Sequence, residues 1–146
     1  MRPAVYLVRH AAADGGVGGK DADRKLTNLG RAGFERLLAS LVPGLTVKRV
    51  LSSPFLRAIE TAEMLGRAAG VPVETWDDLA SGHATVREMV ALARQAGPGS
   101  ALVGHNPEIA EAIVLISGAA AAVPPGTVAA LDLSGASPRL LWLRSP

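Results

Sequence analysis

Two arginines and two histidines in this sequence follow short apolar segments. Arg9 and His10 come directly after one such segment, and His105 follows another. Arg57 stands just beyond a third. Guanidinium groups can hold a phosphate through several planar donors, and a neutral imidazole can attack phosphorus to form a covalent intermediate. These residue types predict a phosphate pocket in which one imidazole helps to bind the anion and the other is free to attack it.

Proton transfer to a poor leaving group would need an acid at the same site. Asp78 lies in the loop expected after the third strand and is the carboxylate that the topology places best, with Asp77 next to it. Asp14 and Asp23, in the loop after His10, are weaker candidates. Because a loop aspartate before a helix often serves only as a turn or cap residue, both interpretations of Asp78 stay open.

The elements that must position these groups alternate between strand and helix. The expected strands cover residues 4–8, 47–51, 71–73 and 100–104, and a terminal hairpin covers residues 128–133 and 139–143. Helices are expected to begin near Thr27, Pro54, Thr85 and Asn106. Such alternation implies βαβ units, so we expect a three-layer α/β/α sandwich around a largely parallel sheet. Ligands bind at the carboxyl ends of the strands in these sheets, which would bring the two arginines and two histidines to one edge.

The composition indicates one folded domain covering residues 1–146. Hydrophobic residues make up 49% of the chain, and the charged fraction of 19% is too low for a disordered tail. The net charge of +2 comes from scattered bases, which argues against a nucleic-acid surface. The absence of cysteine excludes disulfides, thiolate nucleophiles and thiolate zinc sites. No apolar stretch reaches the roughly 20 residues that span a bilayer and no signal peptide is recognisable, so we expect no membrane partner and a cytoplasmic location.

Four short motifs resemble the signatures of one family. Residues 7–11, Leu-Val-Arg-His-Ala, resemble the Arg-His-Gly or Arg-His-Ala signature of the histidine phosphatase superfamily, also called phosphoglycerate mutase-like. Residues 23–30 resemble its Leu-Thr-x-x-Gly helix start, residues 52–62 its second signature and residues 103–106 its third. The motifs occur in order over nearly the whole chain. The small size and the Asp-x-Asp-Arg-x-Leu-Thr segment are most similar to the SixA-type phosphohistidine phosphatase branch.

The resemblance implies a phosphatase with a phosphoglycerate mutase-like fold. It implies that His10 is the nucleophile, with Arg9, Arg57 and His105 around the phosphoryl group. It also implies that no metal or other cofactor is needed, and the three histidines show no ligand spacing such as His-x-x-x-His. The implied substrate is a phosphohistidine protein, such as a histidine phosphotransfer domain.

Several residues near the motifs have two interpretations. Arg24 could reach the substrate or form a structural salt bridge, and His83 could line the rim of the site or be a solvated loop residue. Ser52 and Ser53 suit the turn and the helix cap, with the orientation of the neighbouring Arg-His pair as a second option. Mutase-like members usually have a Ser or Asn shortly after the nucleophilic histidine that helps to hold phosphate, whereas residues 12–16 here read Ala-Ala-Asp-Gly-Gly, which puts that contact in doubt.

Two other functions remain open. The same site could serve a small-molecule phosphomonoesterase or a mutase, although the lack of room for a capping insertion weighs against a mutase. The chain could also be an anion-binding regulatory domain with weak activity. An open site suits a phosphate on a protein surface, and a phosphohistidine leaving group needs less acid help than an alkoxide.

Overall fold

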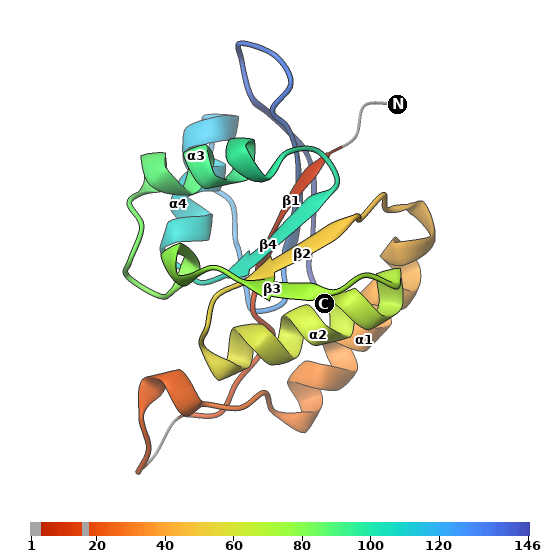
Figure 1. Cartoon of the computed structure of the whole chain (residues 1–146), viewed down its shortest axis with the longest axis vertical. Coiled ribbons are helices and arrows are strands. Elements are labelled where there is room, and N and C mark those ends of the chain that lie inside the picture. The colour runs from red at the N-terminus through yellow and green to blue at the C-terminus, as the bar shows by residue number, and fades with distance from the viewer. Residues whose placement is uncertain (1–3, 16–17) are drawn as a thin grey trace.

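The computed structural model describes residues 4–15 and 18–146, and in that part of the chain six strands form one sheet with helices on both faces (Figure 1). The strands are β1 Val5–Arg9, β2 Arg49–Ser52, β3 Val73–Thr75, β4 Ser100–Gly104, β5 Val128–Asp132 and β6 Arg139–Arg144. The helices are α1 Asn28–Leu41, α2 Leu56–Ala69, α3 Val86–Ala96 and α4 Glu108–Ser117. Short 3-10 turns cover Asp21–Asp23, Val42–Gly44 and Asp77–Leu79.

The order of the sheet is β3-β2-β4-β1-β5-β6. The first four of these strands run parallel, whereas β5 and β6 form an antiparallel hairpin at the edge. The sheet is therefore mixed, with the parallel part that the βαβ pattern predicts and the terminal hairpin added to it. Because β5 runs against β1, Val128 at its start pairs with Val8 near the end of β1. The residues that precede β5 consequently lie at the carboxyl edge of the parallel strands.

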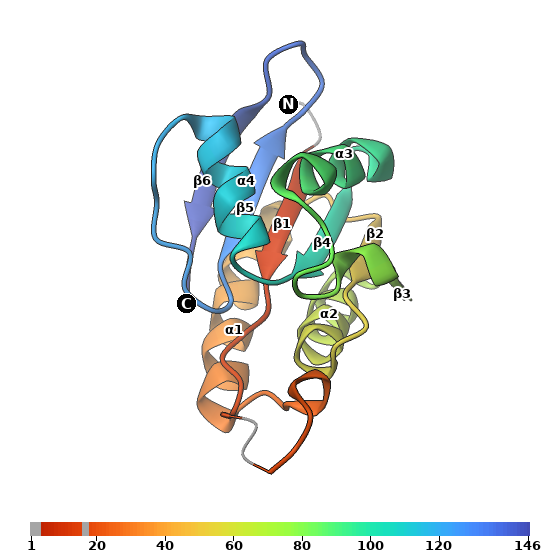
Figure 2. The ribbon, with the colours of Figure 1, turned by 90° about the vertical axis from the view of Figure 1, so that its left-hand side faces the viewer.

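Two hydrophobic layers confirm the predicted α/β/α sandwich. The side chains of β1 alternate, because Tyr6 and Val8 pack into the layer under α1 and α2, while Val5 and Leu7 pack into the layer under α3 and α4. Figures 1 and 2 show the two helix pairs on opposite sides of the sheet. Among the described residues, no helix combines the length and the apolar character needed to cross a membrane.

Local sequence signals explain where two of the helices begin. The Thr27 side chain accepts a hydrogen bond from the Gly30 N–H and caps α1. A Cβ atom on Gly30 would lie only 2.3 Å from the Ala12 carbonyl oxygen, so glycine lets α1 approach the segment after His10. Thr85 and Glu88 form a capping box at the start of α3, where a helix was expected to begin.

Several boundaries differ from the sequence-based expectation by one or two residues, and two of these differences have a clear physical cause. Helix α2 begins at Leu56 rather than at Pro54, because the Ser53 hydroxyl accepts the Phe55 N–H and holds the preceding residues in a turn. Strand β3 covers Val73–Thr75 rather than residues 71–73, since the N–H of Val71 is bonded to the carbonyl at the end of α2. In the sheet, β3 is an edge strand.

Candidate active site

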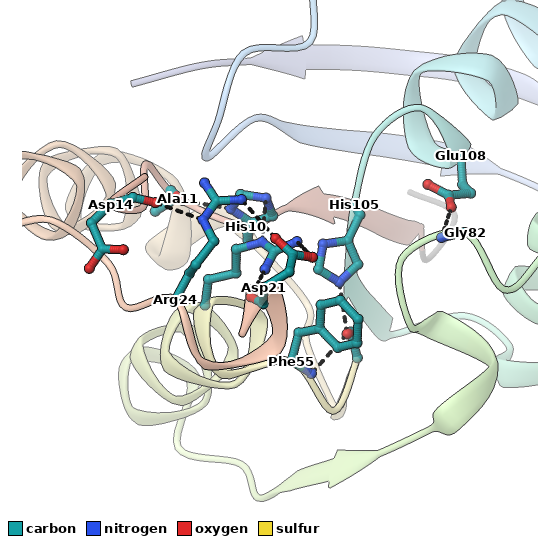
Figure 3. Close-up of polar contacts among 11 residues, drawn as sticks. His10, Ala11, Asp14, Asp21, Arg24, Phe55, Gly82, His105 and Glu108 are labelled. Carbon is teal, nitrogen blue, oxygen red and sulfur yellow. Dashed lines mark hydrogen bonds and ion pairs between the residues drawn. The ribbon is translucent and has the colours of Figure 1, made fainter. Parts of the chain in front are cut away.

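The two arginines and two histidines singled out in the sequence lie at one edge of the sheet. Arg9 ends β1, and β1 pairs with β4 so that Arg9 lies beside Gly104, the residue before His105. Arg57 is the second residue of α2. Its Nε lies 3.3 Å from the Nε2 of His10, and the two histidine rings are 5.3 Å apart between centroids (Figure 3). The structure thus brings these groups together at the ends of β1, β2 and β4.

His10 is held as one particular neutral tautomer. Its Nδ1 lies 2.7 Å from the carbonyl oxygen of Ala11, which can only accept, so Nδ1 carries the hydrogen. The lone pair is therefore on Nε2, where the Nε–H of Arg57 donates to it. Burial, with the charges of Arg57 and Arg9 nearby, lowers the pKa of His10 to about 4. At neutral pH the ring thus presents an uncharged nitrogen that can act as a nucleophile.

Two other nitrogens of the pocket are buried and unsatisfied. The Nδ1 of His105 and the Nε of Arg9 have no hydrogen-bond partner among the described residues. One other nitrogen of each side chain is anchored: His105 Nε2 lies 2.8 Å from Ser53 Oγ, and Arg9 Nη1 donates to the Val123 carbonyl at 2.9 Å. Burial, followed by the charge of Arg57, lowers the pKa of His105 to about 3, so this ring is neutral too. Buried polar atoms without partners mark a place where a ligand can bind.

Asp21 is a pocket residue that the sequence reasoning did not single out. The Nη1 of Arg57 donates to the Asp21 carbonyl at 2.7 Å, and Nη2 donates to the Asp21 carboxylate at 3.3 Å. The carboxylate also accepts from Arg24 at 3.1 Å. This hydrogen bond and the charge of Arg57 hold the pKa of the Asp21 carboxyl below its usual range. A sequence signal could have identified Asp21. It is an acidic residue three positions before Arg24, in the loop after a candidate nucleophile.

Arg24 has structural contacts at the rim of the pocket. Its Nε donates to the Asp14 carbonyl at 2.7 Å and its Nη1 binds Asp21. Figure 3 shows the Asp14 carboxylate turned away from His10. The positive charge of Arg24 still contributes to the lowered pKa of His10. These contacts support the structural interpretation of Arg24. Its guanidinium also lies close enough to the pocket for its charge to lower the pKa of His10.

Asp78 and His83 contact each other and have no described hydrogen bond to these groups. His83 Nε2 lies 3.4 Å from Asp78 Oδ1, and the side chains of Asp78 and His83 are 62% and 56% exposed. Both line a shallow pocket against α3, together with Glu88 and Leu92. None of the contacts described for the chain joins either side chain to His10, and the structure does not bring them to the histidine pair.

Further residues hold the backbone of His10 and of the segment after it. The Thr61 hydroxyl donates to the Arg57 carbonyl at 2.7 Å and accepts the Ala11 N–H at 3.0 Å, which ties α2 to the segment after His10. The N–H of Gly126 donates to the Arg9 and His10 carbonyls at 3.1 and 2.8 Å. The segment 124–126, Pro-Pro-Gly, thus holds the site through the backbone of Gly126. For Thr61, the four-residue spacing from Arg57 on one helix is the signal that sequence reasoning could have used.

The arrangement suits a compact anion with several oxygens. The guanidinium groups of the arginines supply positive charge and planar hydrogen-bond donors. The neutral imidazole of His10 presents the lone pair of its Nε2 to the guanidinium of Arg57. Within residues 4–15 and 18–146, no three histidine, aspartate or glutamate side chains come together as metal ligands.

Comparison with known proteins identifies the family. A model of the histidine phosphatase superfamily (branch 1) matches residues 5–99. An uncharacterised protein of Picosynechococcus sp. is 34% identical over 113 residues, which cover 73% of this chain and 68% of that protein.

Two solved structures are similar over almost the full chain. The protein histidine phosphatase SixA in complex with tungstate is 27% identical, with a TM-score of 0.79 and coverage of 98% of this chain and 97% of that one. A protein of Agrobacterium tumefaciens assigned as a phosphohistidine phosphatase SixA is 26% identical, with a TM-score of 0.84 and coverage of 100% and 99%.

These similarities confirm the predicted phosphoglycerate mutase-like fold and the predicted phosphatase that acts through histidine. The matched residues contain Arg9, His10 and Arg57, and the structural match extends over the rest of the chain to His105. The chain belongs to branch 1 of the histidine phosphatase superfamily.

Proposed function

We propose that this protein hydrolyses phosphohistidine on a protein substrate through a covalent intermediate at His10. The observation that supports it most directly is the tautomer of His10. Its Nδ1–H is bound to the Ala11 carbonyl, which leaves an unprotonated Nε2 beside the guanidinium of Arg57. A buried imidazole whose pKa is about 4 needs no base to activate it at neutral pH.

The reaction has two displacements at phosphorus. In the first, the Nε2 lone pair of His10 bonds to phosphorus while the bond to the leaving nitrogen breaks, and that nitrogen keeps the electron pair and takes a proton from solvent. In the second, water attacks phosphorus, the bond to His10 breaks, and phosphate leaves as the water loses a proton. Both steps build charge on three equatorial oxygens, so catalysis depends mainly on positioning and electrostatic stabilisation.

The pocket supplies donors for those oxygens. Arg57 is anchored beside His10, and the buried Nε of Arg9 and Nδ1 of His105 are free to take part. We assign phosphoryl binding to these three residues and nucleophilic attack to His10. Each oxygen then meets a donor that is fixed before the substrate arrives, which is the condition for effective stabilisation of the transition state.

The substrate class follows from the carboxylates around the pocket. The pKa of the Asp21 carboxyl is lowered by Arg24 and Arg57, so it is ionised at neutral pH and cannot give a proton to a leaving group. The described partner of the Asp78 carboxylate is His83, and no described hydrogen bond joins that carboxylate to either histidine of the pocket. An alkoxide needs an acid, whereas the nitrogen of phosphohistidine leaves with less help. The similarity to SixA structures supports the same class.

The test compares leaving groups on one enzyme. Wild-type protein and the His10→Ala variant are incubated in EDTA with a phosphohistidine protein, an aryl phosphate and an alkyl phosphate. We expect the wild type to dephosphorylate the phosphohistidine protein fastest, to act slowly on the alkyl phosphate, and to form an acid-labile phosphoenzyme that His10→Ala lacks. The His83→Ala variant is the matched control, since its exposed ring lies outside the pocket.

Each other outcome has a definite meaning. No turnover and no phosphoenzyme in the wild type would overturn the covalent mechanism and leave an anion-binding domain. Turnover of the aryl phosphate without turnover of phosphohistidine would assign a small-molecule phosphomonoesterase, and loss of activity in EDTA would indicate a metal mechanism. An Asp78→Asn variant should match the wild type on all three substrates, and a loss confined to the alkyl phosphate would restore Asp78 as the acid.

A further inference from the structure

A buried serine connects the start of α2 to the second histidine of the pocket. Ser53 is fully buried, and its Oγ accepts the Phe55 N–H at 3.1 Å. The same Oγ lies 2.8 Å from the Nε2 of His105. The His105 ring is also fixed by Phe55, whose ring lies edge-on at 5.1 Å between centroids. The orientation of His105 is therefore set by the turn between β2 and α2.

The hydrogen of the serine hydroxyl decides the tautomer of His105. A hydroxyl has one hydrogen to donate, and within the described part of the chain Ser53 Oγ has only Phe55 and His105 as partners. The Phe55 N–H can only donate, so the hydroxyl hydrogen is satisfied by the lone pair of His105 Nε2. The opposite arrangement, with Nε2–H donating to Ser53, would leave the buried hydroxyl hydrogen without an acceptor, which is costly.

We propose that Ser53 is a positioning residue that keeps His105 in its Nδ1–H tautomer and thereby turns a neutral N–H toward the phosphoryl group. The Nδ1 of His105 is buried without a partner in the described structure, and Figure 3 shows this nitrogen on the side of the ring that faces Asp21 and His10. In the other tautomer a lone pair would face the phosphoryl oxygens and repel them. This inference rests on the proposed phosphoryl pocket.

The two histidines of the pocket then carry the hydrogen on the same atom and perform opposite tasks. The Ala11 carbonyl accepts from Nδ1 of His10, so Nε2 faces phosphorus as a nucleophile. Ser53 instead donates to Nε2 of His105, so Nδ1–H faces the phosphoryl oxygens as a donor. Because burial lowers the pKa of His105 to about 3, the second ring acts as a neutral donor at working pH.

The tautomer can be measured directly in the free protein. Two-bond proton–nitrogen NMR correlations of the imidazole rings show which nitrogen of His105 carries the hydrogen. We expect Nδ1–H in the wild type, both free and with tungstate bound. In Ser53→Ala we expect a shift of His105 toward Nε2–H. Ser52→Ala is the matched control, because Ser52 is equally buried and its hydroxyl bonds to the Ser53 carbonyl instead of to His105.

The affinity for tungstate should change with the tautomer of His105. Ser53→Ala should bind tungstate about tenfold more weakly, in line with the loss of one hydrogen bond to a charged group, whereas Ser52→Ala should bind it as the wild type does. Ser53→Thr, which keeps the hydroxyl, should restore the Nδ1–H form.

An Nε2–H form of His105 in the wild type would overturn the proposal without any variant, as would a Ser53→Ala protein that keeps Nδ1–H. The NMR measurement does not depend on turnover. If the tautomer behaves as expected and no phosphoramidate is hydrolysed, the proposed function fails and the role of Ser53 stands.

Discussion

Burial is the main cause of the unusual protonation of the pocket residues. For both His10 and His105, removal of the ring from water lowers the pKa more than the neighbouring arginines do. The fold excludes water from the two rings through the turns after β1 and β4, so the nucleophile needs no partner to remove its proton.

The activity should stay constant at much lower pH than an ordinary histidine would allow. Protonation of Nε2 removes the nucleophile, and the pKa of His10 is about 4. With an aryl phosphate, kcat/KM should be level from pH 8 to about pH 5 and should fall about tenfold per unit below about pH 4. His83→Ala should give the same profile, since that ring is exposed. A fall that begins near pH 6.5 would show that His10 titrates like a free imidazole.

The carboxylate of Asp21 occupies donors that an incoming phosphoryl group needs. It binds Arg57 and Arg24, and its negative charge opposes a second anion in the pocket. Asp21→Asn should therefore bind tungstate about fivefold more tightly, a modest gain because the side chain is largely exposed and screened. Affinity can be measured by calorimetry.

Asp23→Asn is the matched control for this change. Asp23 lies in the same 3-10 turn and is exposed, and its carboxylate has no described bond to Arg57. Weaker binding of tungstate in Asp21→Asn, with Asp23→Asn unchanged, would mean that the Asp21 carboxylate is needed to hold Arg57 in place.

At the scale of elements, α1 and α2 position the nucleophile through different contacts with the segment after β1. Helix α2 reaches it through a hydrogen bond from the backbone to Thr61, and α1 through the close approach of Gly30. The sheet therefore supplies the direction of the His10 backbone, while the two helices fix the turn that follows it.

Thr61→Val should lower both stability and activity. Valine keeps the shape of threonine but leaves the buried Ala11 N–H without an acceptor, which costs about 1–3 kcal/mol. The free energy of unfolding can be measured by urea denaturation and compared with kcat/KM. A variant as stable and as active as the wild type would show that the hydroxyl does not hold the segment.

Gly30→Ala should be more damaging than the same change at Gly33, one turn later in α1. A Cβ on Gly30 would lie 2.3 Å from the Ala12 carbonyl oxygen, so the backbone after His10 would have to move. A Cβ on Gly33 would meet its nearest neighbour at 3.4 Å, an ordinary contact, and alanine favours a helix by about 1 kcal/mol. Thermal unfolding of both variants should separate them, and equal melting temperatures would contradict this account.

At the scale of the whole molecule, segments distant in sequence meet in one pocket, so binding there should stabilise the entire fold. Tungstate should raise the melting temperature in a concentration-dependent way, with about 1.4 kcal/mol for each tenfold excess over Kd. Arg57→Lys keeps the charge but loses the planar fork and should reduce the shift. Arg67→Lys, exposed near the end of the same helix, should not. Equal shifts in both variants would place tungstate elsewhere.

The sequence predicted the strand-and-helix order and the convergence of the arginines and histidines, because these depend on periodicity and on the rule for parallel strands. It did not predict the contact of Asp21 with Arg57, which joins a short 3-10 turn to a helix 36 residues away. Nor did it predict that Asp78 would turn to His83. Such contacts depend on the conformation that loops adopt against the packed core. Local sequence patterns carry no information about that conformation.

The place of β1 between β4 and β5 also matters during synthesis. The nucleophile is translated early, yet both strands that border it, and Gly126 that bonds to its backbone, are translated much later. A nascent chain that ends before β4 already has α1 and α2 to contact the turn after His10, but it lacks the neighbouring strands and the Gly126 hydrogen bonds to the Arg9 and His10 carbonyls. The pocket is therefore complete only after β5 has been made, and we expect a chain cut short before β5 to be inactive although it already contains Arg9, His10, Arg57 and His105.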